Sequence, residues 1–194
     1  MKKIFTQVRK WIVKEEHEHY VLLLLATVAF TESIIFPLPV DIFTLGLSSI
    51  RPKRWFFYAL IATLFSVLGA LVAYIIGMKF SSLAYHIASL FHYEALMLKL
   101  IEVFRSSSFL SIFTSAFTPI PYKVFTLSAG VASLPLFPFL TASLLGRGLR
   151  FFLESYLGMK FGEEIAKKHM RKTNIVSFVV IAIIILIFLA RKFL

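Results

Sequence analysis

Six ionisable residues interrupt the long apolar stretches of this chain, and they are the side chains that could do chemistry. Within a bilayer a charged side chain costs about 2.5–3.5 kcal/mol or more, so it is by default a candidate functional group. Carboxylates held in a low dielectric could exchange protons near neutral pH, and cations could bind an anion. The six are Glu32, Asp41, Lys123, Arg147, Arg150 and Glu154.

The three cations suit an anionic group such as phosphate. Arg147 and Arg150 are three residues apart and share one face of a helix. Their guanidinium groups can hold a phosphate through two parallel hydrogen bonds, whereas Lys123 offers a point charge. The alternative is that these groups only neutralise one another, and the i,i+4 spacing of Arg150 and Glu154 predicts such an ion pair. Because buried ion pairs can be replaced by apolar residues at little loss of stability, the positions of Glu32, Asp41 and Lys123 favour a functional use.

The segments that must position these charges form an internal repeat. The stretch FPLPVDIFTL, from Phe36 to Leu45, is repeated 82 residues later as TPIPYKVFTL, from Thr118 to Leu127. The repeat places Asp41 on Lys123, so equivalent positions carry opposite charges, and we expect the two side chains to be neighbours if the two hairpins face each other. Two prolines in each copy break an apolar run and are predicted to form the tip of a hairpin: Pro37 and Pro39 in the first copy, Pro119 and Pro121 in the second.

Composition indicates an integral membrane protein with a single membrane domain, residues 1–194. The chain is 59% hydrophobic, has a mean hydropathy of +0.85 and carries a net charge of +11. Soluble domains are about 45–50% apolar. In a membrane protein an excess of Lys and Arg sets topology and meets anionic headgroups, so we expect no nucleic-acid partner. The absence of cysteine from the sequence excludes disulfides and thiol catalysis.

Length argues that the proline-broken segments enter the membrane and return. Residues 20–50 are too long for one span of about 20 residues and too short for two spans joined by a turn. We therefore predict re-entrant hairpins at 20–50 and 106–134. Such irregular backbone survives at membrane depth only where it is buried in protein or lines a wet cavity.

The remaining chain completes an all-α polytopic membrane protein. We predict an interfacial amphipathic helix at 1–19, transmembrane helices at 55–77, 135–158 and 174–190, interfacial helices at 78–105 and a basic loop at 159–173. The motif Gly-Met-Lys-Phe stands at the end of the predicted transmembrane helix 55–77, as residues 77–80. It stands again at the end of the predicted helix 135–158, as residues 158–161. Each copy of the repeat then contains a hairpin and one crossing, so the two copies must be inverted relative to each other, as in many transporters.

Charge asymmetry predicts the orientation. Residues 1–19, 51–54 and 159–173 hold 13 Lys and Arg, against 5 in 78–105 and 191–194. Positive flanks lie on the cytoplasmic side, so we expect a cytoplasmic N-terminus and, with these crossings, an external C-terminus.

Other polar clusters do not form a recognisable catalytic set. Residues 15–19, EEHEH, could be taken for a metal cluster, but a solvated helix end is the better interpretation because no partner ligand follows at fixed spacing. His86 and His92 are expected at the surface. Gly130, Gly146 and Gly148 are expected to serve packing or hinge motion, since no strand precedes them as in a phosphate-binding loop. We therefore expect neither an enzyme nor a metal or cofactor.

The two hairpin motifs resemble those of the DedA family, bacterial and archaeal inner-membrane proteins also described as SNARE-associated or VTT-domain proteins. The similarity spans residues 20–162 and includes Glu32-Ser33, PLPVD at 37–41, TPIPYK at 118–123 and Gly146-Arg147. By position, Glu32 and Asp41 match the family's essential acidic pair, and Lys123 replaces the second of two arginines. The first arginine is absent, because Phe117 stands there; Arg147 is a candidate to supply the missing charge.

The resemblance implies two opposed re-entrant hairpins and transport of undecaprenyl phosphate or phospholipids, driven by the protonmotive force, in the plasma (inner) membrane of a bacterium or archaeon. A flippase or scramblase of this kind would take a membrane lipid and protons as partners. Two alternatives remain open from the residues: a proton- or cation-coupled carrier of a small solute, and a structural protein of membrane homeostasis. Self-association into a homo-oligomer is also left open.

Overall fold

The computed structural model is all-helical in the residues it describes, which are residue 12 and residues 17–35, 39–106 and 121–169. This confirms the all-α prediction. In chain order the elements are α2 (Glu18–Glu32), α3 (Val40–Ile50), the short 3-10 helix η2 (Pro52–Arg54), α4 (Trp55–Lys79), α5 (Ser81–Ser89), α6 (Glu94–Ser106), α8 (Tyr122–Val131) and α9 (Leu136–His169).

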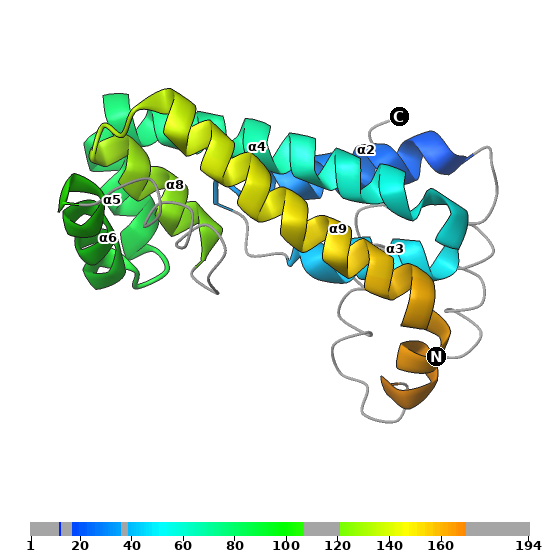
Figure 1. The fold of residues 1–194 in the computed structure, drawn as a ribbon. Coiled ribbons are helices and arrows are strands. Elements are labelled where there is room, and N and C mark those ends of the chain that lie inside the picture. The colour runs from blue at the N-terminus through cyan, green and yellow to red at the C-terminus, as the bar shows by residue number, and fades with distance from the viewer. Residues whose placement is uncertain (1–11, 13–16, 36–38, 107–120, 170–194) are drawn as a thin grey trace, which may run out of the picture.

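Two of these helices, α4 and α9, run side by side in opposite directions along the length of the molecule (Figure 1). In the part of the chain that the structure describes, residues 52–79 and Leu136–Gly162 are the two segments long and apolar enough to cross a membrane. Large apolar side chains on these helices point outward, Leu64 and Leu68 on α4 and Leu145 and Leu149 on α9 among them. Such exposure is unusual for a water-soluble surface and suits contact with hydrocarbon.

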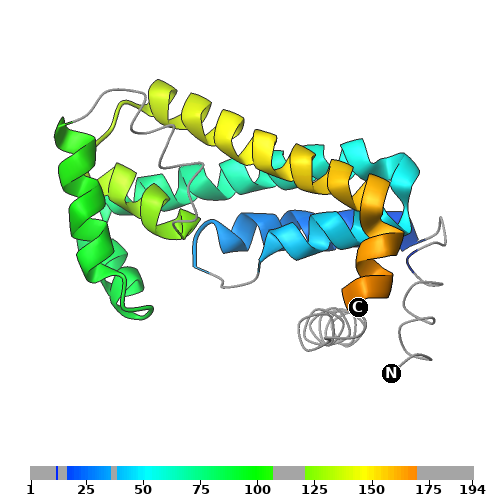
Figure 2. The same ribbon diagram turned by 60° about the horizontal axis from the view of Figure 1, so that its bottom comes forward.

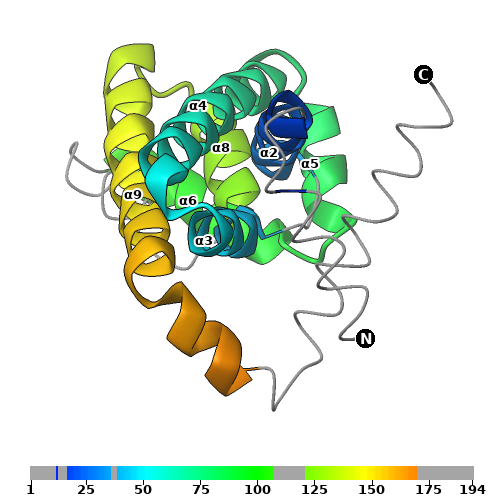
Figure 3. The ribbon, with the colours of Figure 1, turned by 90° about the vertical axis from the view of Figure 1, so that its right-hand side faces the viewer.

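Shorter helices fill the space beside this long pair. Helices α2 and α3 lie along one half of α4 and α9, and α8 lies along the other half (Figures 1 and 2). Helices α3 and α8 have 11 and 10 residues, about 16 and 15 Å at 1.5 Å per residue. A membrane's hydrocarbon core is about 30 Å thick. Seen end-on, α2 and α3 lie beside α4 and α9, with α5, α6 and α8 behind (Figure 3).

Two glycines allow the short helices to approach the long ones closely. A Cβ at Gly77 of α4 would overlap the backbone carbonyl of Leu127 in α8, and a Cβ at Gly158 of α9 would overlap that of Leu45 in α3. In the sequence repeat, Leu45 corresponds to Leu127 and Gly77 to Gly158. Each short helix therefore packs against the long helix of the other repeat, through an equivalent contact.

The end of the molecule beyond α8 is closed by α5 and α6. The turn between these helices includes His92, whose φ is 57°, a left-handed conformation that lets the chain reverse. Helix α6 packs on α8, where Phe104 and Phe125 meet edge to face with ring centroids 5.4 Å apart. Residues 78–105 thus form the end of α4 and two short helices; their position at a membrane surface stays a prediction.

One predicted boundary is wrong. The basic segment 159–173 was expected to be a loop, but α9 continues through His169. Residues 163–168, EEIAKK, are mostly strong helix formers, so the helix does not end with the apolar pattern. The predicted amphipathic helix at 1–19 lies largely, and the C-terminal span at 174–190 wholly, outside the described residues. So do most of the first limb of the second hairpin, residues 107–120, and the tip residues Pro37 and Pro119.

Candidate functional site

The second proline of each tip begins a short helix. Pro39 caps α3 with φ −74° and ψ 105°, and Pro121 caps α8 with φ −56° and ψ 115°. The fixed φ of proline and its missing N–H suit this position, where a helix leaves donors unpaired. Asp41 and Lys123 follow two residues later, in the first turns of α3 and α8. An acid there is favoured by the helix dipole, whereas a lysine is disfavoured and needs compensating contacts.

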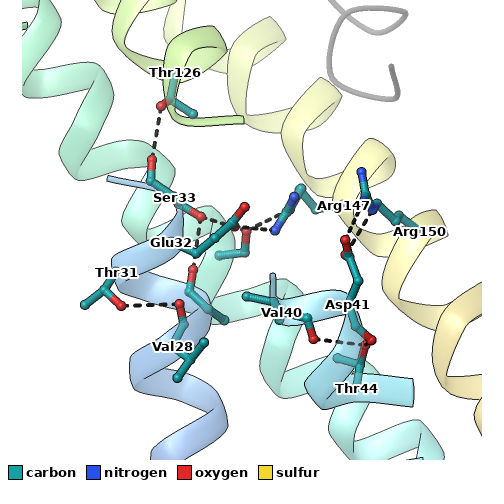
Figure 4. Close-up of polar contacts among 12 residues, drawn as sticks. Val28, Thr31, Glu32, Ser33, Val40, Asp41, Thr44, Thr126, Arg147 and Arg150 are labelled. Atoms are coloured by element: carbon teal, nitrogen blue, oxygen red, sulfur yellow. Dashed lines mark hydrogen bonds and ion pairs between the residues drawn. The ribbon is translucent and has the colours of Figure 1, made fainter. Parts of the chain in front are cut away.

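Glu32, the last residue of α2, forms an ion pair with Arg147 of α9. The Arg147 Nη2 lies 2.7 Å from Glu32 Oε2, and the arginine side chain is only 4% exposed while that of the glutamate is 20% exposed. The Nε of Arg147 donates to the Ser66 hydroxyl on α4 at 2.9 Å, and that hydroxyl lies 2.9 Å from the hydroxyl of Ser33. Figure 4 shows these polar groups converging between α2 and α9.

Aromatic rings complete the surroundings of Arg147. Its guanidinium carbon lies 4.5 Å from the ring centre of Tyr122 on α8 and 4.4 Å from that of Phe151 on α9. Cation–π contacts of this kind are worth about 0.5–2 kcal/mol each. Arg147 of α9 therefore contacts the end of α2, helix α4 and the start of α8.

A second charged cluster lies one helical turn away on α9. Both nitrogens of one edge of the Arg150 guanidinium, Nε and Nη2, donate to the Asp41 carboxylate, with Nε 3.0 Å from Oδ1 (Figure 4). The same Nε lies 3.1 Å from Glu154 Oε1, and the Thr44 hydroxyl donates to Glu154 Oε2 at 3.3 Å. The predicted ion pair of Arg150 and Glu154 is thus present. Asp41 and Arg150 are about one-third exposed, so this cluster is more accessible than Arg147.

Lys123 lies against the end of α2 and the α5–α6 turn. Its Nζ donates to the carbonyl of Ile35 at 3.2 Å and lies 3.2 Å from the ring centre of Phe91, with Tyr93 at 5.9 Å. One turn further on, Thr126 donates to the carbonyl of Ser33 at 3.2 Å. These donors satisfy carbonyls that a helix leaves unpaired at its C-terminus. The residues that end α2 and the first turns of α8 therefore meet through polar contacts.

The pairing between the tips differs from the one expected from the repeat. Asp41 and Lys123 were expected to be neighbours, but Asp41 pairs with Arg150 and Lys123 contacts backbone carbonyl and aromatic rings. The reason is that Ser33 and Ile35, just after the end of α2, contact the first turns of α8, so Lys123 meets the end of α2. Helix α3 instead lies along α9, so Asp41 meets Arg150.

The sequence did not single out the side chains that support the charged ones. These are the hydroxyls of Ser33, Thr44, Ser66 and Thr126 and the rings of Phe91 and Tyr93. A signal for one of them exists. The offset of 81 residues that relates Gly77 to Gly158 also relates Ser66 to Arg147, and these two side chains touch. Residues that correspond in an internal two-fold repeat and contact each other must lie near its axis. Among the described residues, no three His, Cys, Asp or Glu side chains are grouped to hold a metal ion.

The sequence is similar to one known protein family and to proteins of two bacteria. The family model of the VTT domain matches residues 59–160, which include Lys123, Arg147 and Arg150. An uncharacterised protein of Haemophilus influenzae is 30% identical over 190 residues, with 98% of this chain and 99% of the relative covered. An uncharacterised protein of Histophilus somni is 27% identical over 194 residues, covering 98% of this chain and all of the relative. No solved structure matches the chain significantly.

Proposed function

Because the chain belongs to the VTT-domain family, also called the DedA family, it is a membrane protein, and we propose that it transports a lipid with an anionic phosphate headgroup. The headgroup of a phospholipid, or of a polyprenyl phosphate such as undecaprenyl phosphate, would be taken up between the tips of the two hairpins. The protein acts as a transporter and not as an enzyme.

The observation that carries this proposal is the position of Arg147. It is buried, it holds one carboxylate, and it touches three other helices, α2, α4 and α8. A phosphate oxygen can replace the Glu32 carboxylate on the guanidinium with similar geometry, so exchange of one anion for the other avoids leaving a buried charge unpaired. Arg150, one turn further along α9, and Lys123, beside the end of α2, supply two more cations for a headgroup.

The path across the membrane is proposed to use an inverted repeat of re-entrant hairpins. Helices α3 and α8, at about 16 and 15 Å, are each long enough to span about half of the membrane's hydrocarbon core. Helix α8 packs on α4 at Gly77 and α3 packs on α9 at Gly158, and these equivalent contacts support a two-fold relation between the repeats. The contact between Ser66 and Arg147 supports an axis at the centre. Movement of one repeat against the other around this centre would open the headgroup site to the two leaflets in turn.

We further propose that the transporter lies in the plasma membrane of a bacterium, with its N-terminus cytoplasmic, and that protons take part. The Lys and Arg bias along the chain supports the orientation. Three carboxylates in the site, on Glu32, Asp41 and Glu154, supply groups that could carry a proton.

Reconstitution in liposomes tests the function. Translocation of labelled phospholipid and of labelled polyprenyl phosphate is measured for the wild type, for Arg147→Gln and for the double variant Asp41→Asn, Lys123→Ala. Arg54→Gln is the matched control, because Arg54 is an exposed arginine paired with Glu18. We expect loss of translocation in the first two variants and wild-type rates in the control. Undiminished translocation in the double variant would refute these roles, and uptake of free phosphate without lipid movement would favour a solute carrier.

A further inference from the structure

The two arginines of α9 are not equivalent in charge. Arg147 faces one acid, Glu32, whereas Arg150 donates to two, Asp41 and Glu154. One guanidinium offsets one carboxylate. With both acids ionised, the Arg150 cluster would hold one uncompensated negative charge inside a membrane protein, which is costly.

The two acids of this cluster are held by the same nitrogen. Arg150 Nε lies 3.0 Å from Asp41 Oδ1 and 3.1 Å from Glu154 Oε1. This nitrogen carries a single hydrogen, and ionised carboxylates only accept hydrogen bonds, so the two acids compete for one donor. The remaining contact of Glu154, from the Thr44 hydroxyl to Oε2 at 3.3 Å, comes from the same helix as Asp41. A single proton on the pair removes the excess charge and the competition for this donor.

The charges around the pair can be named for each helix packed against it. Helix α9 contributes Arg150 and Glu154, and α3 contributes Asp41. From α2, Glu32 is held by Arg147. The residues buried in the first half of α4, Tyr58, Ala59, Ala62 and Thr63, are uncharged at neutral pH. Lys123 of α8 donates to the carbonyl of Ile35, after the end of α2.

From this geometry we propose that Asp41 and Glu154 share one exchangeable proton, and that this proton couples lipid transport to a pH gradient by releasing Arg150 for the headgroup. The inference rests on the proposed function. When the pair is protonated, the hold of Asp41 on Arg150 weakens and the guanidinium can take a phosphate oxygen. When the proton leaves, the carboxylate competes for Arg150 and expels the headgroup. Proton and headgroup are thus bound together and move in the same direction.

Exposure separates the two arginines and not their acids. The side chain of Arg150 is 34% exposed, against 4% for Arg147, whereas Glu154 and Glu32 are similar at 17% and 20%. The Arg150 cluster, in which Asp41 is 30% exposed, is therefore the one whose cation an anion can reach without opening the ion pair between Glu32 and Arg147. Glu154 is the new element of this assignment, because the hairpin motifs of the sequence do not include it.

The test uses the full-length protein in liposomes with a pH difference of about two units across the membrane. With one proton per lipid, such a gradient can drive about a 100-fold asymmetry of labelled lipid between leaflets, since each pH unit is a factor of ten. We expect Glu154→Gln to lose the accumulation that the gradient drives in the wild type. Glu154→Asp, which keeps a titratable group, should retain coupling. Glu94→Gln, on the exposed face of α6, is the control.

Proton binding is measured separately by infrared difference spectroscopy during a pH titration. The carbonyl band of a protonated carboxyl group should be present in the wild type and in Glu94→Gln and reduced in Glu154→Gln. Accumulation by Glu154→Gln at the wild-type level, an unchanged band, or driving by a sodium gradient would each overturn the shared proton. An absence of lipid exchange in the wild type with a normal band would instead overturn the proposed function.

Discussion

Removing either partner of the Glu32–Arg147 ion pair should destabilise the protein far more than removing a surface ion pair. Arg147 is 4% exposed, and Glu32 Oε2 lies 2.7 Å from its Nη2. Truncating one partner of such a pair leaves a buried charge without compensation, which costs about 3–5 kcal/mol. We expect a cost of this size for Glu32→Leu. For Arg147→Met it should lie at the upper end, because the Ser66 hydrogen bond and two cation–π contacts are lost as well.

The double variant separates stability from function. Replacing both members by apolar side chains removes the uncompensated charge, and such replacements are often neutral or stabilising. We therefore expect Glu32→Leu, Arg147→Met to unfold within about 1 kcal/mol of the wild type, or later, while lipid translocation stays abolished. Free energies of unfolding are measured by titrating the protein from mild-detergent micelles into denaturing SDS, with helix content followed by circular dichroism.

Arg54→Gln provides the comparison, since the Arg54 side chain is 47% exposed and lies 3.2 Å from Glu18. An exposed pair of this kind contributes about 0–1 kcal/mol. The reasoning is refuted if the single variants at Glu32 and Arg147 cost no more than Arg54→Gln. It is also refuted if the cost of the double variant equals the sum of the two single costs, because additivity would mean that the two side chains are not coupled.

Two further predictions concern packing and the position of Lys123. Gly158→Ala should destabilise the protein by about 1–3 kcal/mol, because its Cβ would overlap the Leu45 carbonyl. Gly46→Ala is the control: its Cβ would meet nothing within 4 Å, so it should be neutral or stabilise by about 0.5–1 kcal/mol. Equal effects of the two variants in the SDS titration would contradict the close contact. Phe91→Leu removes the ring over the Lys123 ammonium, worth about 0.5–2 kcal/mol. It should raise the KM for the lipid about 2- to 30-fold at nearly constant kcat, and an unchanged KM would show that the ring does not position Lys123.

The candidate site could be anticipated in its residue types but not in its pairing. An ionisable residue in an apolar stretch stands out in any sequence, so Glu32, Asp41, Lys123 and Arg147 could be selected without a structure. The supporting hydroxyls could not, because serine and threonine are common in membrane helices and become informative only when a partner is known. Ser66 is the exception, since the repeat relates it to Arg147.

The helix ends show a similar division. The prolines predicted a break in each apolar run, because a proline restricts the backbone locally. The structure shows that a short helix begins directly after the second proline of each pair. The end of α9 was misplaced, because the apolar pattern stops near 158 while the helix continues on residues that favour helix without being apolar.

The amino-acid sequence by itself determined that this is an all-helical membrane protein with a duplicated proline-broken segment and a small set of charges inside it. These properties depend on composition and local spacing. Only the tertiary structure decided that Glu32 meets Arg147, that Asp41 and Glu154 share Arg150, and that Lys123 meets the end of α2. The partners of Glu32 and Asp41 lie 115 and 109 residues away. Such pairings depend on where helices cross, and those crossings are set by backbone contacts at glycines such as Gly77 and Gly158.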